Sequence, residues 1–104
     1  MENKIRYYIV NKHYHDFSSL SDLPNVELVM LTEGKVNVFH TERLKSEMKA
    51  KMTETEITAN DFVVVCGAGV LNVLAVLAMK EIVGKVNVAI WNHGDKSYKR
   101  RFDV

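Results

Sequence analysis

The sequence has almost no cysteine and almost no net charge. Cys66 is the one cysteine among 104 residues. A single cysteine excludes an internal disulfide framework and is typical of a reducing compartment. The formal net charge of +1 provides no overall field that would draw the chain to nucleic acid or to a membrane surface, so we expect neither as a partner.

Long apolar runs are also lacking. The longest, from Phe62 to Met79, is interrupted by Asn72 and by a Gly-Ala-Gly turn at 67–69, whereas a membrane span needs roughly 20 continuous apolar residues. The first residues, 1–4, carry no apolar segment of a secretory signal. We therefore expect a cytoplasmic protein without a membrane span.

The chain does contain alternating β-prone and helical segments. Hydrophobic residues make up 47% and charged residues 26% of it, which is typical of one globular domain, here 1–104. Helices are expected at about 41–52 and 70–83, and a short one at 16–23. Strands are expected at 4–10, 62–66 and 85–91, and 97–104 is expected to pair as an antiparallel edge strand.

Two patterns support these assignments. In the first helix, Leu44, Met48 and Met52 lie at i, i+4 and i+8 and form an apolar stripe. The continuous apolar run 62–65 is typical of a central parallel strand that is buried on both faces. Because a strand, a helix and a strand follow one another over 62–91, we expect a right-handed parallel unit.

The segment between 26 and 39 has two interpretations. Two short β-prone runs, 26–31 and 36–39, flank a turn and favour a β-hairpin. However, the pentamer Gly-Lys-Val-Asn-Val occurs at both 34–38 and 84–88. A duplication would make 26–33 a short helix like 70–83, and coincidence between two similar strand entries is the alternative.

The predicted fold class is α/β, a small Rossmann-like open mixed sheet with a parallel centre, an antiparallel C-terminal edge strand and helices on the sheet faces. The carboxyl ends of parallel strands share one edge, where ligands usually bind in such folds. The loops expected there supply candidate ligand-binding residues: Asn11, Gly67, Ala68, Gly69, Asn72 and Asn92. The same loops supply three candidate catalytic bases: His13, His15 and His93.

The turn Gly67-Ala68-Gly69 before a helix can bring backbone N–H groups to an anion. It is only a partial dinucleotide fingerprint, because Asn72 stands where the third glycine belongs and no acidic residue closes the next strand. We expect no dinucleotide cofactor. A plain tight turn is the alternative to a phosphate contact.

Metal and thiol chemistry are poorly supported. His13, His15 and Asp16 are too few for a metal site and lack a further ligand at diagnostic spacing, so solvated loop histidines are the better interpretation. Cys66 precedes a helix N-terminus, which lowers a thiol pKa. No arginine closes the turn as a phosphatase loop requires, so we interpret Cys66 as a small buried hydrophobe.

A basic run follows the last turn. Its residues are Lys96, Lys99, Arg100 and Arg101, and Lys4 and Arg6 of the first strand can join them. Such a face could hold the phosphates of a nucleotide or of RNA. A solvated edge strand explains the same residues without any ligand.

The helix at 70–83 is apolar apart from Asn72 over its first ten residues. A small domain cannot easily cover such a helix on every side, which predicts a homodimer packed around 70–79. In layout, 61–91 and the tail resemble small Rossmann-like nucleotide-binding domains, including dimeric sensors and nucleases for cyclic oligonucleotides. The compact chain also resembles phage or mobile-element accessory proteins.

These features lead to two hypotheses. The first is a module that binds a nucleotide or another phosphorylated small molecule. The second is a non-catalytic protein that associates with itself or with a protein partner.

Overall fold

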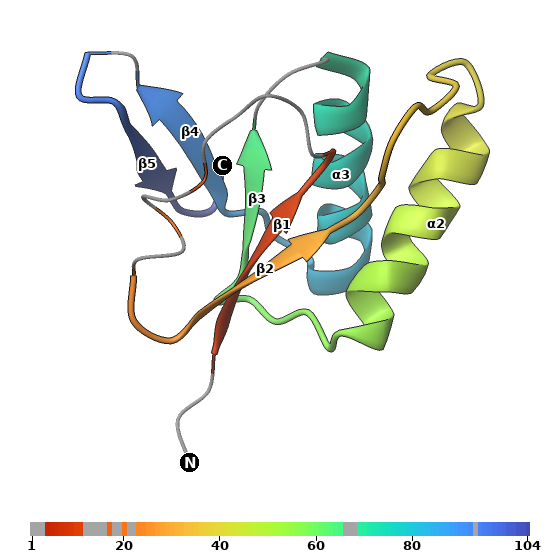
Figure 1. Cartoon of the computed structure of the whole chain (residues 1–104). Helices are drawn as coiled ribbons and strands as arrows, with labels where there is room; N and C mark the ends of the chain where they lie inside the picture. Colours follow the sequence, from red (N-terminus) through yellow and green to blue (C-terminus); the bar gives the residue numbers. More distant parts are fainter. Residues whose placement is uncertain (1–3, 12–16, 18–19, 21–22, 66–68, 93) are drawn as a thin grey trace.

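The computed structural model describes residues 4–11, 17, 20, 23–65, 69–92 and 94–104. They form β1 (Ile5–Ile9), β2 (Val26–Met30), α2 (Thr41–Glu54), β3 (Phe62–Val65), α3 (Gly69–Val83), β4 (Val88–Asn92) and β5 (Ser97–Arg101) (Figure 1). The sheet order is β2-β1-β3-β4-β5. Strands β1 to β4 are parallel, and β5 is antiparallel to β4. This confirms the predicted mixed α/β sheet with an antiparallel C-terminal edge.

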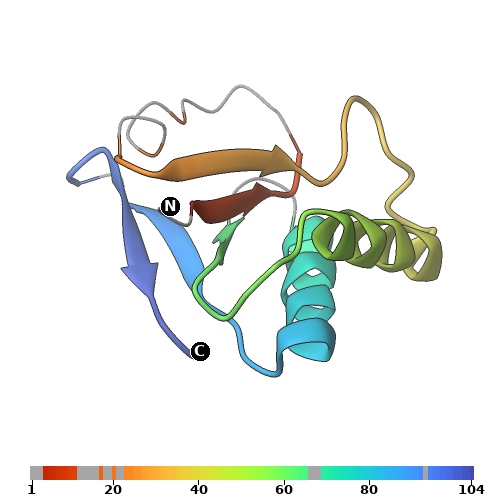
Figure 2. The ribbon, with the colours of Figure 1, turned by 90° about the horizontal axis from the view of Figure 1, so that it is seen from below.

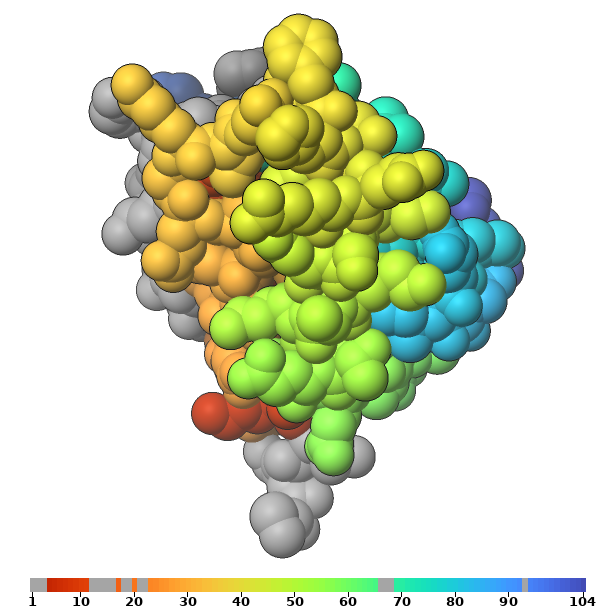
Figure 3. Space-filling model, turned by 90° about the vertical axis from the view of Figure 1, so that its right-hand side faces the viewer, coloured from red at the N-terminus to blue at the C-terminus, as the bar shows by residue number. Residues whose placement is uncertain are grey.

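Helices α2 and α3 lie side by side against one face of the sheet (Figure 2). In the view of Figure 3, α2 crosses the surface between β2 and α3. On the opposite face, Phe17 of the β1–β2 connection stacks on Tyr98 of β5, with ring centroids 6.1 Å apart. The two connections lie on opposite faces because both are right-handed crossovers that run in opposite directions across the sheet. The chain passes from β1 outward to β2, and from β2 it returns past β1 to β3. Right-handed connections in opposite directions cover opposite faces.

The hairpin prediction for 26–39 is wrong. Strand β2 pairs with β1 in parallel, with Ile5 opposite Val26, and no strand covers 36–39. The reason lies in contacts between the ends of β1 and β2. The Leu31 amide donates to the Ile9 carbonyl at 2.8 Å, and the Thr32 hydroxyl donates to the Val10 carbonyl.

The duplication interpretation also required a helix over 26–33, and the structure contradicts it. The short helix expected at 16–23 falls mostly outside the described residues.

The apolar stripe of α2 is confirmed, since Leu44, Met48 and Met52 are its buried residues. Across the helix pair, Glu81 of α3 accepts from Lys45 at 2.8 Å and from Lys49 at 3.2 Å. These hydrogen bonds, led by the one from Lys45, hold the pKa of the Glu81 carboxyl below its ordinary 4.5. The bridges are exposed, and pairs of this kind contribute little to stability. Burial of the apolar faces therefore holds the helices on the sheet.

Two buried polar residues, Asn87 and Asp61, connect the central strands at the edge of the sheet where these strands begin. The side chain of Asn87 donates to the carbonyls of Ala59 at 2.8 Å and Asp61 at 3.0 Å, and it accepts from the Asp103 amide at 3.0 Å. The Asp61 carboxylate accepts from the Arg6 amide at 2.8 Å. These bonds tie the start of β1, the entry to β3 and the C-terminal tail to the segment before β4.

The two copies of the pentamer Gly-Lys-Val-Asn-Val provide a matched test of the role of Asn87. Asn37 and Asn87 occupy the same position of the two copies, but Asn37 is exposed and Asn87 is fully buried. We expect Asn87→Ala to lower the free energy of unfolding by at least about 2 kcal/mol, because buried hydrogen-bonding groups lose their partner. For Asn37→Ala we expect a loss below about 1 kcal/mol. Urea unfolding followed by circular dichroism measures both, and equal losses would contradict the role assigned to Asn87.

Candidate functional site

The predicted common edge exists: β1, β3 and β4 are parallel, so their carboxyl ends point the same way. The order β2-β1-β3-β4 reverses direction between β1 and β3, which is where ligands bind in open α/β sheets. Five of the predicted site residues lie outside the described residues, namely His13, His15, Gly67, Ala68 and His93, and so does Cys66.

Two of the predicted ligand-binding residues at this edge have structural hydrogen bonds. Asn11 is buried, and its side-chain nitrogen donates to the Gly34 carbonyl at 2.9 Å. The side-chain oxygen of Asn92 accepts from the amides of Gly94 at 2.8 Å and Asp95 at 3.4 Å, which stabilises the turn between β4 and β5. Neither contact requires a ligand, but the side-chain oxygen of Asn11 is buried and has no hydrogen-bond partner among the described residues.

The other two described candidates lie at the start of α3. Gly69 is the first residue of the helix, and a Cβ atom built there would meet nothing within 4 Å. Asn72 is half-buried in the first turn, which contains no acidic residue. An anion at this helix end stays a prediction.

A larger hollow lies at the opposite edge, where the parallel strands begin. Its volume is about 760 Å³, against about 330 Å³ beside Trp91 and about 400 Å³ between Met30 and α2. It is formed by the starts of β1 and β3, the α2–β3 connection and the end of β5. Its lining residues are Lys4, Ile5, Arg6, Glu56, Thr58, Asn60, Phe62, Arg100 and Phe102. We call it the basic hollow.

The basic hollow brings together part of the predicted basic face. Lys4, Arg6 and Arg100 line it, and Glu56 is the one acid among its described lining residues. Arg6 has Glu27 nearby, with Nε and Oε1 3.9 Å apart. Among the described residues, no carboxylate forms an ion pair with Lys4 or Arg100. Two of the three cations therefore have no acidic partner in the part of the chain that the structure describes.

Strand alternation explains why only Arg100 of the run on β5 lines the basic hollow. Arg100 is opposite Ala89, on the face that also carries Tyr98, whereas Lys99 and Arg101 point to the other face. These two line the smaller hollow beside Trp91, and Lys99 also pairs with Asp95 at 2.6 Å.

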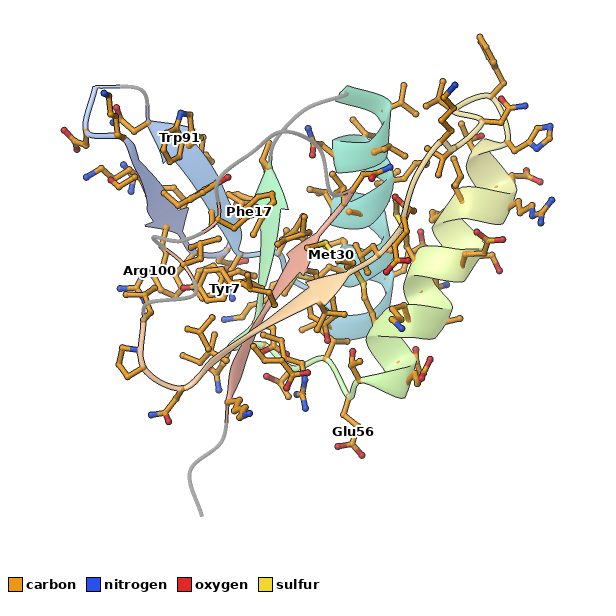
Figure 4. All side chains as sticks on the ribbon, in the orientation of Figure 1. Tyr7, Phe17, Met30, Glu56, Trp91 and Arg100 are labelled. Atoms are coloured by element: carbon orange, nitrogen blue, oxygen red, sulfur yellow. The ribbon has the colours of Figure 1, made fainter. Side chains whose placement is uncertain are left out.

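Aromatic rings complete the basic hollow. Phe62 is buried and stacks on Tyr7, with ring centroids 4.9 Å apart, and Phe102 meets Phe62 edge to face at 5.2 Å. Tyr7 and Arg100 lie on the side of the sheet away from α2 and α3 (Figure 4). The hydroxyl of Tyr7 is buried and has no hydrogen-bond partner among the described residues.

Sequence reasoning missed the aromatic part of this site. The sequence predicts Phe62 in a buried strand, which β3 confirms. It predicts Phe102 in an edge strand over 97–104, whereas β5 ends at Arg101 and Phe102 follows it. The available signal was the spacing of Arg100 and Phe102, since alternate residues of an extended segment point to the same side. Nothing in the sequence placed Thr58 and Asn60 beside them.

A scan against models of protein families found no match, and searches of curated proteins and of solved structures found none either. Of the helices in the described residues, none is long and apolar enough to cross a membrane. The described part of the chain also contains no cluster of three or more histidine, cysteine, aspartate or glutamate side chains that could hold a metal ion. A cytoplasmic location and a phage or mobile-element origin stay predictions.

Tyr8 lies beside this site but faces the helices. Its hydroxyl pairs with the Thr55 hydroxyl at the end of α2, at an oxygen–oxygen distance of 2.6 Å. Burial raises the pKa of the Tyr8 phenol above its ordinary 10.0, and the contact with Thr55 opposes this only in part. The folded protein therefore keeps Tyr8 protonated at a higher pH than the unfolded chain does.

This shift predicts a loss of stability in alkali. The contribution of Tyr8 is complete below the unfolded value near 10.0 and falls as the pH rises above it, because the unfolded chain then releases the proton first. Between about pH 9 and about pH 11, we expect the wild type to lose more unfolding free energy than Tyr8→Phe. At neutral pH the variant should be less stable by about 1 kcal/mol. Chemical unfolding across this pH range tests the difference, and parallel curves would contradict it.

Proposed function

We propose that the protein binds a small phosphorylated molecule in the basic hollow. The carrying observation is that Lys4 and Arg100 line the hollow without an acidic partner among the described residues. Arg6 lies near Glu27, and Glu56 is the one acid among the described residues of the lining. Arginine and lysine bind phosphate through charge-assisted hydrogen bonds. None of the described lining residues is a histidine or a cysteine that could act as a base or nucleophile, so the proposal is one of binding.

The basic hollow has better support than the edge predicted from topology. At that edge, the side-chain nitrogen of Asn11 and the side-chain oxygen of Asn92 already have partners within the protein. In the basic hollow, neither Lys4 nor Arg100 forms an ion pair with an acidic side chain among the described residues. The volume of about 760 Å³ also falls within the usual range for small-molecule sites, roughly 300–1,000 Å³.

Arg100→Gln tests the proposal, and Arg101→Gln is its matched control. Both changes remove one positive charge from neighbouring residues of β5, but only Arg100 lines the basic hollow. The probes are inorganic phosphate, ribose 5-phosphate and AMP, measured by thermal shift and by titration calorimetry. We expect at least one probe to bind the wild type, Arg100→Gln to weaken it at least about tenfold, and Arg101→Gln to change it less than about threefold.

Two outcomes would contradict this site. If the folded wild type binds none of the phosphorylated probes, the proposed function is wrong. Equal weakening by both arginine variants would mean that overall charge, and not the basic hollow, is responsible. Higher salt should weaken genuine binding, since ions screen the attraction between phosphate and exposed cations.

A second candidate function, self-association, has its own supporting observation. On α3, Val70, Val73 and Leu77 are 43%, 57% and 44% exposed. They lie at i, i+3 and i+7 and so form an apolar stripe on one side of the helix. We propose that a two-fold homodimer covers this stripe, because a self-complementary contact would remove it from water.

Leu77→Asp tests the dimer, with Ile90→Asp as its control. Leu77 and Ile90 are equally exposed, at 44% each, but Ile90 belongs to β4. Leu74 is unsuitable because it is only 7% exposed and a buried charge would unfold the chain. We expect light scattering to give a dimer for the wild type and for Ile90→Asp and a folded monomer for Leu77→Asp. A wild type that is monomeric at high concentration would contradict the proposal.

A further inference from the structure

The ring of Phe102 is exposed at the rim of the basic hollow. Phe102 is 63% exposed, although its edge contact with Phe62 orients it. The backbone beyond it is held, because the Asp103 amide donates to the side chain of Asn87 at 3.0 Å and the Val104 amide donates to the Val86 carbonyl at 2.9 Å. The protein thus presents a positioned aromatic ring to solvent, beside two cations that have no acidic partner among the described residues.

Arg100 and Phe102 are suited to two different parts of one ligand. Arg100 belongs to β5, which ends at Arg101, and Phe102 is the next residue along the chain. Alternate residues of an extended segment have Cα atoms about 6.5–7 Å apart. A positive group and an aromatic face at this spacing can contact a phosphate and a planar ring of the same small molecule. Aromatic side chains bind nucleobases by stacking, whatever the base, because every base has a π-face.

The lining of the basic hollow also contains two uncharged polar residues, Thr58 and Asn60. The side-chain amide of Asn60 makes no hydrogen bond among the described residues, so it keeps both its donors and its acceptor. The Thr58 hydroxyl already has a partner within the protein, since it accepts a hydrogen bond from the backbone amide of Asn60 at 3.2 Å. Asn60 is therefore the lining group that can bind sugar hydroxyls or a base edge.

From this arrangement we infer that the ligand of the basic hollow is a nucleoside phosphate, with its base stacked on Phe102 and its phosphate held by Arg100 and Lys4. The inference rests on the proposed phosphate-binding function and goes beyond it by assigning the ring. A mononucleotide fits better than a nucleic-acid strand, because the formal net charge is only +1 and binding along a strand depends on an extended positive surface.

The test compares ligands with and without a base. Wild type, Phe102→Leu and Phe102→Tyr are titrated with AMP, GMP, CMP and UMP, with ribose 5-phosphate, and with inorganic phosphate. We expect wild type and Phe102→Tyr to bind the nucleotides about 5- to 150-fold more tightly than ribose 5-phosphate, which is the range of base stacking on an aromatic ring. In Phe102→Leu this ratio should fall close to one, with unchanged affinity for ribose 5-phosphate.

The outcomes separate this inference from the proposed function. If ribose 5-phosphate and the nucleotides bind the wild type equally, the ring assignment is wrong and phosphate binding still holds. An unchanged nucleotide preference in folded Phe102→Leu would also overturn the ring assignment. If no phosphorylated compound binds, both proposals fail. Tighter binding of a short single-stranded oligonucleotide than of any mononucleotide would overturn the choice of ligand.

Discussion

The hydrogen bonds between Asn87 and the segment that precedes β3 hold the rest of the structure in place. Asn87 binds the Ala59 and Asp61 carbonyls, and the Asp61 carboxylate in turn accepts from the Arg6 amide. Asn87 and Asp61 are buried, so their side chains would be costly without these partners. Through them β1, β3 and β4 start at a common level, and the bond from the Asp103 amide brings the C-terminal tail to the same place.

The basic hollow depends directly on this arrangement. Lys4 and Phe62 stand at the starts of two strands that the Asp61 carboxylate and the Asn87 amide align, and Phe102 precedes the residue whose amide Asn87 binds. Lys4, which precedes β1, and Phe102, in the C-terminal tail, therefore line the same hollow although nearly the whole chain separates them. The apolar stripe on α3 belongs to the other face of the sheet, so the two proposed functions use separate surfaces.

Much of the fold could be predicted from local patterns. Three patterns were each sufficient to predict one element. The stripe of Leu44, Met48 and Met52 predicted α2, the apolar run that begins at Phe62 predicted β3, and the alternation of the tail predicted β5. The segment from 26 to 39 could not be predicted in this way. Local propensity favours a hairpin there, but contacts of Leu31 and Thr32 with the end of β1 favour parallel pairing. Those contacts join residues more than 20 positions apart (22 for both), and no sequence window includes both partners.

By itself, the sequence determined the fold class, the two helices, the parallel centre and the antiparallel edge, because periodicity and apolar runs reflect which face each element buries. The sequence also indicated a basic surface formed by the run from Lys96 to Arg101 together with Lys4 and Arg6. Only the tertiary structure decided which of those cations act together, since alternation along β5 separates Arg100 from Lys99 and Arg101. It also gave the two Gly-Lys-Val-Asn-Val copies different roles, with Asn87 buried and Asn37 exposed. A side chain's chemistry is fixed by its residue type, but its burial and its partners depend on segments that are distant in the chain.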